Sequence, residues 1–272
     1  MISNSHFADF KGTNSVIFID RTDSNLRVFH CGFEDCYRKS YYSYPKDGHQ
    51  IGGVCIIHNG NNASLNYISC CSCKVDYDTF ISTFNQNQPS NSHIYNEISF
   101  HNCVSPSYFI LTDISPAYFY NINSSNSKST AGTLFHSGWG SVGCNSTFWT
   151  LSNNTCFILL GHSNTQNDFY FLKLLSNQNQ YIFQFYNRGS TIISNSIILG
   201  NNMRIFNTGT LTLDNCIYDK KDDFNVNPNC KLAQTYSIYI VYSCLNFYQC
   251  ACSIKNYCFR SKYMYSFIIA LI

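Results

Sequence analysis

The sequence YIFQFYNRGSTIISNSIILG at residues 181–200 is followed at residues 201–220 by NNMRIFNTGTLTLDNCIYDK, and the two stretches align without a gap. Asn195 and Asn215 occupy the same place in this alignment. A fixed period of about 20 residues is typical of stacked architectures, in which each repeat contacts mainly its neighbours. The alignment therefore predicts a repeat protein.

Within one repeat, the side chains alternate in the manner of a strand. The run LTLD at residues 211–214 has an apolar residue at every second position, which is typical of a strand with one buried face. Gly189 and Gly209 indicate a bend with positive φ, because glycine adopts that conformation without a Cβ clash. An asparagine beside the bend, Asn187 or Asn207, tolerates the left-handed region. We therefore predict an all-β protein, a right-handed parallel β-helix (a solenoid) with coils of about 20 residues and a poorly defined C-terminal tail.

The same bend pattern, two apolar residues, then Asn or His, any residue and Gly, recurs elsewhere in the chain. It places His58 and His136 where residues 181–220 have asparagine, and His30 lies in a further match. A position shared by His and Asn indicates hydrogen bonding rather than metal binding or base catalysis. We expect the structural ladder of the coils to consist of Asn187, Asn207, Asn195, Asn215, Gly189, Gly209, Gly60 and Gly138.

The composition excludes some classes of protein. The 272 residues are enough for one large domain with a continuous core. Only 12% are charged and 17% are aromatic, a balance that argues against disorder. The formal net charge is +2, and Lys and Arg are scattered rather than gathered in a stripe. We therefore expect no nucleic-acid partner.

The chain contains 15 cysteines, and three of them, Cys103, Cys156 and Cys216, fall where a stacked coil would point inward. A buried cysteine behaves as a small apolar residue, so we interpret these positions as core. A tetrahedral zinc site needs two knuckles at matched spacing, and the sequence does not contain such a set. We predict no metal site and no cofactor.

An enzyme is the main alternative, because polysaccharide lyases and glycoside hydrolases use this pectin-lyase-like scaffold. Such sites need several carboxylates on one face. No Asp or Glu lies between Asp113 and Asp168, the middle of the predicted helix, so we predict no catalytic residue. Trp139 and Trp149 are candidates for stacking on a sugar ring, and packing in the core or a loop is the other interpretation.

Three segments carry a resemblance to a known family: VFHCGFEDC at residues 28–36, GGVCI at residues 52–56 and LNYISC at residues 65–70. They are similar to the large, repetitive, Asn- and Cys-rich right-handed β-helix surface proteins of anaerobic parasitic protists, which are themselves likened to bacterial polymorphic outer-membrane proteins. The resemblance implies a membrane-tethered ectodomain without known catalysis and with a role in adhesion.

We expect residues 1–25 to form a cap or lead-in strand, residues 26–219 the β-helix, and residues 220–272 a tail. Residues 233–254 contain no charged residue and are long enough to span a bilayer as a tether. A cap over the end of the coils is the alternative. The chain does not begin with a basic segment followed by an apolar one, so no secretory signal peptide is predicted in it.

The leading functional hypothesis is a non-enzymatic surface or interaction module with an unknown protein or glycan ligand. A cell-surface or membrane location is implied by the resemblance alone. The alternatives are the enzyme described above and an intracellular structural repeat protein. An exposed aromatic or apolar patch would favour the binding module.

Overall fold

The structure is a computed structural model, and it describes residues 1–13, 15–21, 23–39, 53–76, 79–84, 92–106, 108–112, 117–129, 132–136, 144–147, 150–152, 158–160, 166–175, 177, 183–185, 190–201, 205–206, 210–219, 225–226 and 228–232. By its internal packing the chain divides into two units, Met1–Gln234 and Thr235–Ile272. All of the described residues belong to the first unit.

The described part of the chain is all-β and contains no helix, and its strands form three sheets, here named A, B and C. Every strand pair in it is parallel. Sheet A consists of β1 (Ile2–Ala8), β4 (Asn25–Glu34), β7 (Asn62–Cys71), β10 (His93–His101), β13 (Ala117–Tyr120), β14 (Asn123–Ser125), β17 (Cys144–Thr147), β18 (Thr150–Ser152), β20 (Gln166–Tyr170), β21 (Lys173–Leu175), β23 (Ser190–Ser194), β24 (Ile197–Leu199), β26 (Thr210–Asp214), β27 (Ile217–Tyr218), β28 (Asn225–Val226) and β29 (Lys231–Leu232).

The other two sheets are built from shorter strands. Sheet B consists of β2 (Lys11–Gly12), β5 (Tyr37–Arg38), β8 (Lys74–Val75), β11 (Val104–Ser105) and β15 (Lys128–Ser129). Sheet C consists of β3 (Ile17–Asp20), β6 (Gly53–Asn59), β9 (Thr79–Phe84), β12 (Tyr108–Thr112), β16 (Gly132–His136), β19 (Ile158–Leu160), β22 (Phe183–Phe185) and β25 (Ile205–Phe206).

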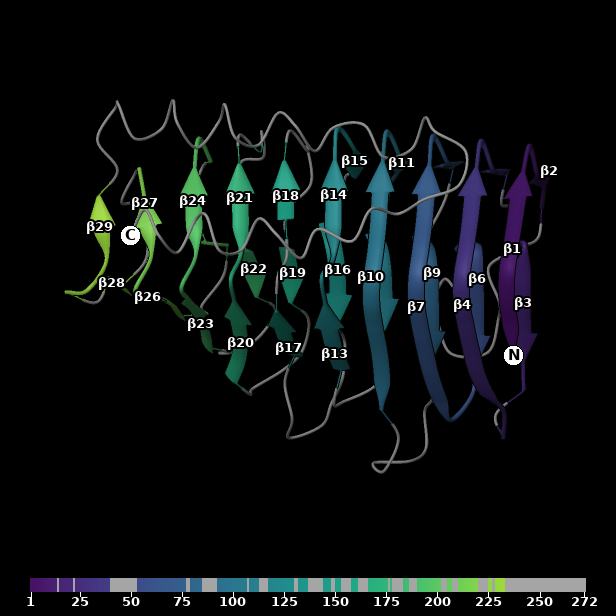
Figure 1. Cartoon of the computed structure of the whole chain (residues 1–272), viewed down its shortest axis with the longest axis horizontal. Coiled ribbons are helices and arrows are strands. Elements are labelled where there is room, and N and C mark those ends of the chain that lie inside the picture. The colour runs from purple at the N-terminus through teal and green to yellow at the C-terminus, as the bar shows by residue number, and fades with distance from the viewer. Residues whose placement is uncertain are drawn as a thin grey trace. The chain divides into compact units, whose positions relative to one another are not determined.

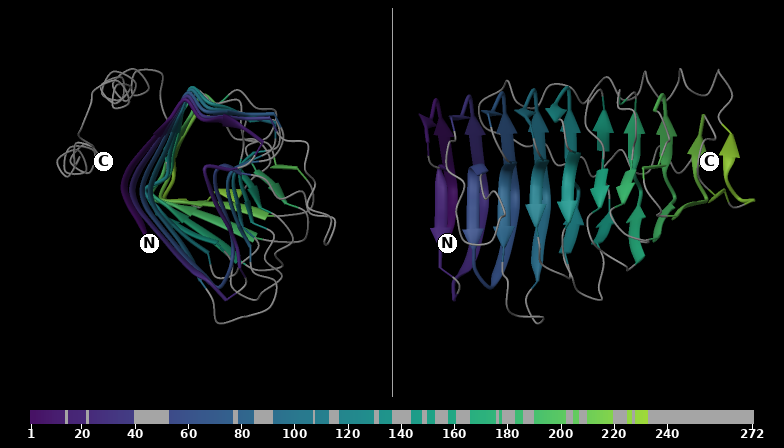
Figure 2. Two further views of the ribbon diagram at one scale, coloured as in Figure 1. Left: turned by 90° about the vertical axis from the view of Figure 1, so that its right-hand side faces the viewer. Right: turned by 180° about the vertical axis from the view of Figure 1, so that it is seen from behind.

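Along the first part of the chain, consecutive strands fall in sheets A, B and C in turn. The chain leaves β4 for β5 and β6 and then returns to sheet A as β7, which pairs with β4. The strands of sheet A therefore lie side by side in sequence order, as Figure 1 shows, and seen end-on they superpose (Figure 2). The paired strands begin at Ile2 and extend to Leu232.

The predicted alignment of residues 181–220 agrees with the register in sheet A, where Ser190 pairs with Thr210, twenty residues later. The fixed period is wrong for the rest of the chain. The partners of β20 and β23 are 24 residues apart, those of β7 and β10 are 30, and those of β4 and β7 are 37. The strands keep their register while the connections vary, because longer loops add little closure entropy.

Sheet C departs from the alignment even within residues 181–220, because Ile205 pairs with Phe183 rather than with Phe185. His58 and His136 do share one position of sheet C, since Thr83 and Thr112 connect them through successive strand pairs. His30 does not, because it lies in β4 of sheet A.

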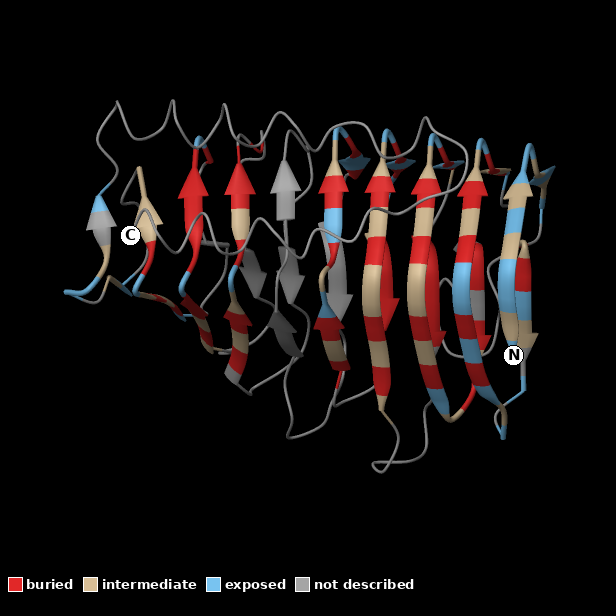
Figure 3. Ribbon diagram, viewed as in Figure 1, coloured by how far each residue is buried: buried red, intermediate tan, exposed pale blue. Residues whose placement is uncertain are grey.

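The core lies between the sheets and is filled by alternate side chains. In β7 the buried side chains are Ala63, Leu65, Ile68 and Cys70, and Figure 3 shows the same banding on neighbouring strands. The step from Leu65 to Ile68 is three residues rather than two. This change of phase requires one extra residue in the middle of the strand, and β4 and β10 have one at the same level.

Substitutions in β26 can test which face of this strand points into the core. Leu213 is fully buried, and Thr212 beside it is only half-buried. Leu213→Ala should lower the free energy of unfolding by roughly 2–5 kcal/mol, since it removes a large buried side chain. Thr212→Ala, the matched control, should change it much less. Denaturant unfolding of both variants measures the difference, and equal midpoints would contradict the assigned inner face.

Candidate functional site

A column of residues with left-handed backbone crosses sheet A at the bend of its strands. By the strand register, each member from Asn4 to Asn121 lies opposite the next, and so does each member from Phe171 to Asn215. The described members, all with φ between 49° and 57°, are Asn4, His30, Tyr67, Glu97, Asn121, Phe171, Asn195 and Asn215. None of these side chains is buried, so the column runs along the outer face of the sheet. We call it the bend column.

The residue types in the bend column differ in their tolerance of this conformation. A left-handed backbone costs about 1–2 kcal/mol for most L-residues, whereas asparagine adopts it more readily. Four members are asparagine, and Asn215 Nδ2 donates a hydrogen bond to Asn195 Oδ1 at 2.7 Å. Bulky residues with positive φ are genuine outliers, and such outliers gather at functional sites. Tyr67 and Phe171 are therefore the members that need an explanation other than folding.

The aromatic members pack with outward-facing neighbours. The His30 and Tyr67 rings stack with their centroids 4.4 Å apart and an interplanar angle of 11°. The Phe29 ring is nearly perpendicular to both, with its centroid 4.1 Å from that of His30 and 5.2 Å from that of Tyr67. Phe29 remains 42% exposed, so the cluster presents an apolar surface to solvent.

A second group of outward-facing rings lies further along sheet A. The Tyr118 and Tyr120 rings of β13 are parallel at 6.4 Å, and Tyr120 is 37% exposed. Phe171, next to β20, is 40% exposed. We define the aromatic face as Phe29, His30, Tyr67, Tyr118, Tyr120 and Phe171.

Amide side chains lie between the two groups of rings. Asn66 and Asn96 pair by register in β7 and β10, and Asn96 Nδ2 donates to Asn66 Oδ1 at 3.3 Å. Asn66 Nδ2 donates in turn to Ser64 Oγ at 2.9 Å. An amide both donates and accepts hydrogen bonds, so this strip can bond to groups of either kind.

The predicted ladder residues have mixed outcomes. Asn195 and Asn215 lie in the bend column, and Gly60 is buried at the end of β6. A Cβ at Gly60 would lie 2.4 Å from both His58 Nε2 and Ser24 Oγ, so close approach explains this glycine. Positive φ among the described glycines occurs at Gly200 instead. The remaining candidates lie outside the described residues: Asn187, Asn207, Gly189, Gly209, Gly138, Trp139 and Trp149.

The aromatic face was not predicted from the sequence. Its signal is weak, because Tyr67 and Phe171 are ordinary strand residues by type, and their backbone conformation is not visible in a sequence. The usable signal was the change of phase in apolar spacing within residues 63–70. That change indicates an extra, outward-facing residue in the middle of the strand.

The interior near β6 contains a buried polar group. His58 Nε2 lies 3.1 Å from Ser24 Oγ, and His93 Nδ1 lies 3.2 Å from Thr112 Oγ1. The two imidazole rings are 6.3 Å apart, and both are fully buried. Burial lowers the pKa of His58 to about 4, because the charged ring would lose its hydration. The geometry favours a neutral, structural His58.

Within the described ranges, no three His, Cys, Asp or Glu side chains are arranged to hold a metal ion. The same part of the chain holds no helix long and apolar enough to cross a membrane. The predicted tether at residues 233–254 lies outside the described residues.

Comparison with known proteins found no matching family model, no matching curated protein and no matching solved structure. The family resemblance of residues 28–36 and their companion segments therefore remains a prediction.

Position 195 tests the bend column. Asn195→Ala should lower the free energy of unfolding by about 1–2 kcal/mol, because alanine resists the left-handed region. Asn195→Gly should cost less, since glycine adopts it without a clash. At Thr212, in an ordinary strand, alanine should instead be better tolerated than glycine. Urea unfolding of the four variants checks this reversal, and the same order at both positions would refute the assignment.

His58 should make the fold sensitive to acid. The unfolded chain binds a proton near pH 6.5 and the folded chain only near pH 4, so stability falls as the pH drops between these values. The full loss should be about 3–4 kcal/mol, since each unit of pKa difference corresponds to about 1.36 kcal/mol. His58→Asn should flatten this slope while lowering stability at every pH. Urea unfolding midpoints of both proteins from pH 7 to pH 4.5 measure how stability changes with pH. The same change with pH in both proteins would exclude His58 as the cause.

Proposed function

We propose that the chain is a non-enzymatic interaction module, built as a right-handed parallel β-helix, that binds a glycan on its aromatic face. The β-helix is favoured by three parallel sheets visited in turn, and its hand by the strong preference for right-handed connections between parallel strands. The function rests on one observation, the presence of the outward-facing aromatic residues Tyr67 and Phe171 at bend positions where asparagine would strain the backbone less.

The chemistry of the aromatic face favours a sugar over a charged ligand. Flat rings such as Tyr67 and Tyr120 can pack against the C–H faces of a sugar ring. The amides of Asn66 and Asn96 can donate to and accept from hydroxyl groups, which have the same dual character. Glu97 is the one carboxylate among the described members of the bend column.

The spacing favours an extended ligand. Phe29 lies in β4 and Tyr120 in β13, and β7 and β10 separate these strands. Three strand spacings correspond to roughly 14 Å. An oligosaccharide that crosses the strands can therefore contact both groups of rings and the amides between them.

The cell-surface location and the membrane tether at residues 233–254 remain part of the same proposal and rest on the family resemblance. Exposed aromatic side chains on a domain surface are typical of interaction sites, and such a location would make this face accessible to external glycans. The enzyme and the intracellular repeat protein are the competing functions.

The full chain should bind glycans on an array of immobilised neutral and acidic oligosaccharides, and titration calorimetry with the best one should give its affinity. Tyr67→Asn and Tyr120→Asn should each weaken binding about tenfold or more, a loss of about 1.4 kcal/mol. Phe18→Ala, the control, removes a ring in sheet C that is 51% exposed and should leave the affinity for the glycan unchanged. Affinity should change little with salt, because few charges take part.

Three results would contradict the proposal. Absence of binding to any glycan would favour a protein ligand or a purely structural role. Unchanged affinity in the tyrosine variants would exclude the aromatic face. Release of new reducing ends or unsaturated products from the bound glycan would indicate a hydrolase or lyase.

A further inference from the structure

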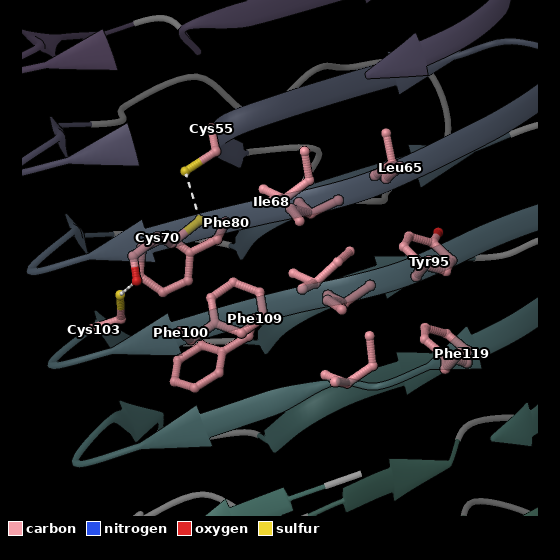
Figure 4. Close-up of a cluster of buried hydrophobic side chains, with 14 of the residues drawn as sticks. Cys55, Leu65, Ile68, Cys70, Phe80, Tyr95, Phe100, Cys103, Phe109 and Phe119 are labelled. Carbon is pink, nitrogen blue, oxygen red and sulfur yellow. Dashed lines mark hydrogen bonds between the residues drawn. The ribbon is translucent and has the colours of Figure 1, made fainter. Parts of the chain in front are cut away.

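Five fully buried cysteines gather where sheets A, B and C meet in the first part of the chain. They are Cys36, Cys55, Cys70, Cys73 and Cys103. Figure 4 shows Cys55, Cys70 and Cys103 directed toward the same part of the core. This concentration of thiols raises the question of what each sulfur does.

Three of the five thiols bond to the backbone in a repeated pattern. Cys36, Cys73 and Cys103 each follow a left-handed residue at the corner between sheets A and B. Each Sγ donates to the carbonyl oxygen two residues earlier, at 3.4 Å in all three cases. Each also reaches a carbonyl of the preceding strand of sheet A, at 3.3–3.5 Å. A hydroxyl can make the same bond, as Ser127 does to the carbonyl of Ser125 at 2.9 Å.

Cys55 and Cys70 form a different arrangement. Their Sγ atoms lie 3.5 Å apart, and they come from β6 in sheet C and β7 in sheet A. A disulfide has its sulfur atoms about 2.05 Å apart. The two sulfurs need to approach by roughly 1.5 Å to bond.

We propose that Cys55 and Cys70 form a disulfide when the chain folds under oxidising conditions, and that this bond links sheet C to sheet A across the core. The oxidant is a low-molecular-weight disulfide such as oxidised glutathione. One cysteine thiolate attacks it, which forms a mixed disulfide and releases one reduced glutathione. The second cysteine then attacks the mixed disulfide and releases the other. Two protein thiols thus lose two electrons and two protons, and one glutathione disulfide becomes two thiols.

The bond forms during folding rather than afterwards. In the folded chain Cys55 is fully buried, and burial raises the pKa of its thiol, so the reactive thiolate is scarce there. Before the core closes, both thiols are accessible to the oxidant. Once formed, the bond is shielded from reductants by the same burial and restricts the unfolded chain.

The test refolds the full chain from denaturant, with a glutathione redox mixture or with dithiothreitol, and then blocks free thiols under denaturing conditions. Trypsin leaves Cys55 and Cys70 in one peptide, because no Lys or Arg lies between them. Chymotrypsin, which cleaves after Tyr67, separates them. A cross-linked pair of peptides that contains Cys55 and Cys70 is the expected product, together with a Tm several degrees above that of the dithiothreitol sample.

Matched variants assign the bond. Cys73→Ser should keep the cross-link, because serine can replace the backbone bond of that thiol as Ser127 does. Cys71→Ser, at a partly exposed neighbour, should also keep it. Cys55→Ala should abolish both the cross-link and the difference in Tm. Blocked Cys55 and Cys70 in a natively folded, glutathione-treated sample, or a bond from Cys55 to another cysteine, would overturn the proposal.

Discussion

The structure depends on one backbone constraint, a left-handed residue at the same two places in successive strands of sheet A. The first place is the bend column, and the second is the corner to sheet B, where Asp35, Ser72 and Asn102 have φ near 52°. Each left-handed residue inserts one extra position and turns the next side chain inward. Because the strands are parallel and in register, every turn of the chain bends at the same level. Sheet A is thus folded in the same way from strand to strand.

The inward position after each corner explains why Cys36, Cys73 and Cys103 are cysteines. A buried position beside two carbonyl oxygens needs a small side chain that can donate a weak hydrogen bond. Cysteine meets this need at Cys73 and Cys103, and serine meets it at Ser127. Asn201 does the same near the other end, with bonds from Nδ2 to the carbonyls of Leu174 and Leu199. Cysteine, serine and asparagine are therefore interchangeable donors in one ladder.

Local patterning made the strand at residues 211–214 and the pairing of Asn195 with Asn215 predictable, because both depend on contacts between adjacent repeats. The lengths of the other repeats were not predictable from the two aligned repeats in residues 181–220. Connections of different length change the number of residues between paired strands without changing how the strands pair. Two adjacent repeats of equal length therefore suggest a more constant period than the chain has. His30 was matched to the bend position of His58 because its flanking residues follow the same pattern, although it lies in another sheet. The aromatic face went unnoticed because it depends on the φ angle of Tyr67 and Phe171.

The connections from sheet A to sheet B have a constant length, whereas the other connections between sheets vary in length. Five strands of sheet A reach sheet B through two residues each, as at residues 72–73 and 102–103, whereas the connection from β5 to β6 spans 14 residues. An insertion at the short corner would displace the donor from its carbonyl partners, whereas the connections at the other two corners already differ in length. Where sheet B is described, new segments can therefore enter the chain during evolution at the other two corners but not at this one. A lineage of such proteins would diversify its loops while its thiol ladder stayed recognisable.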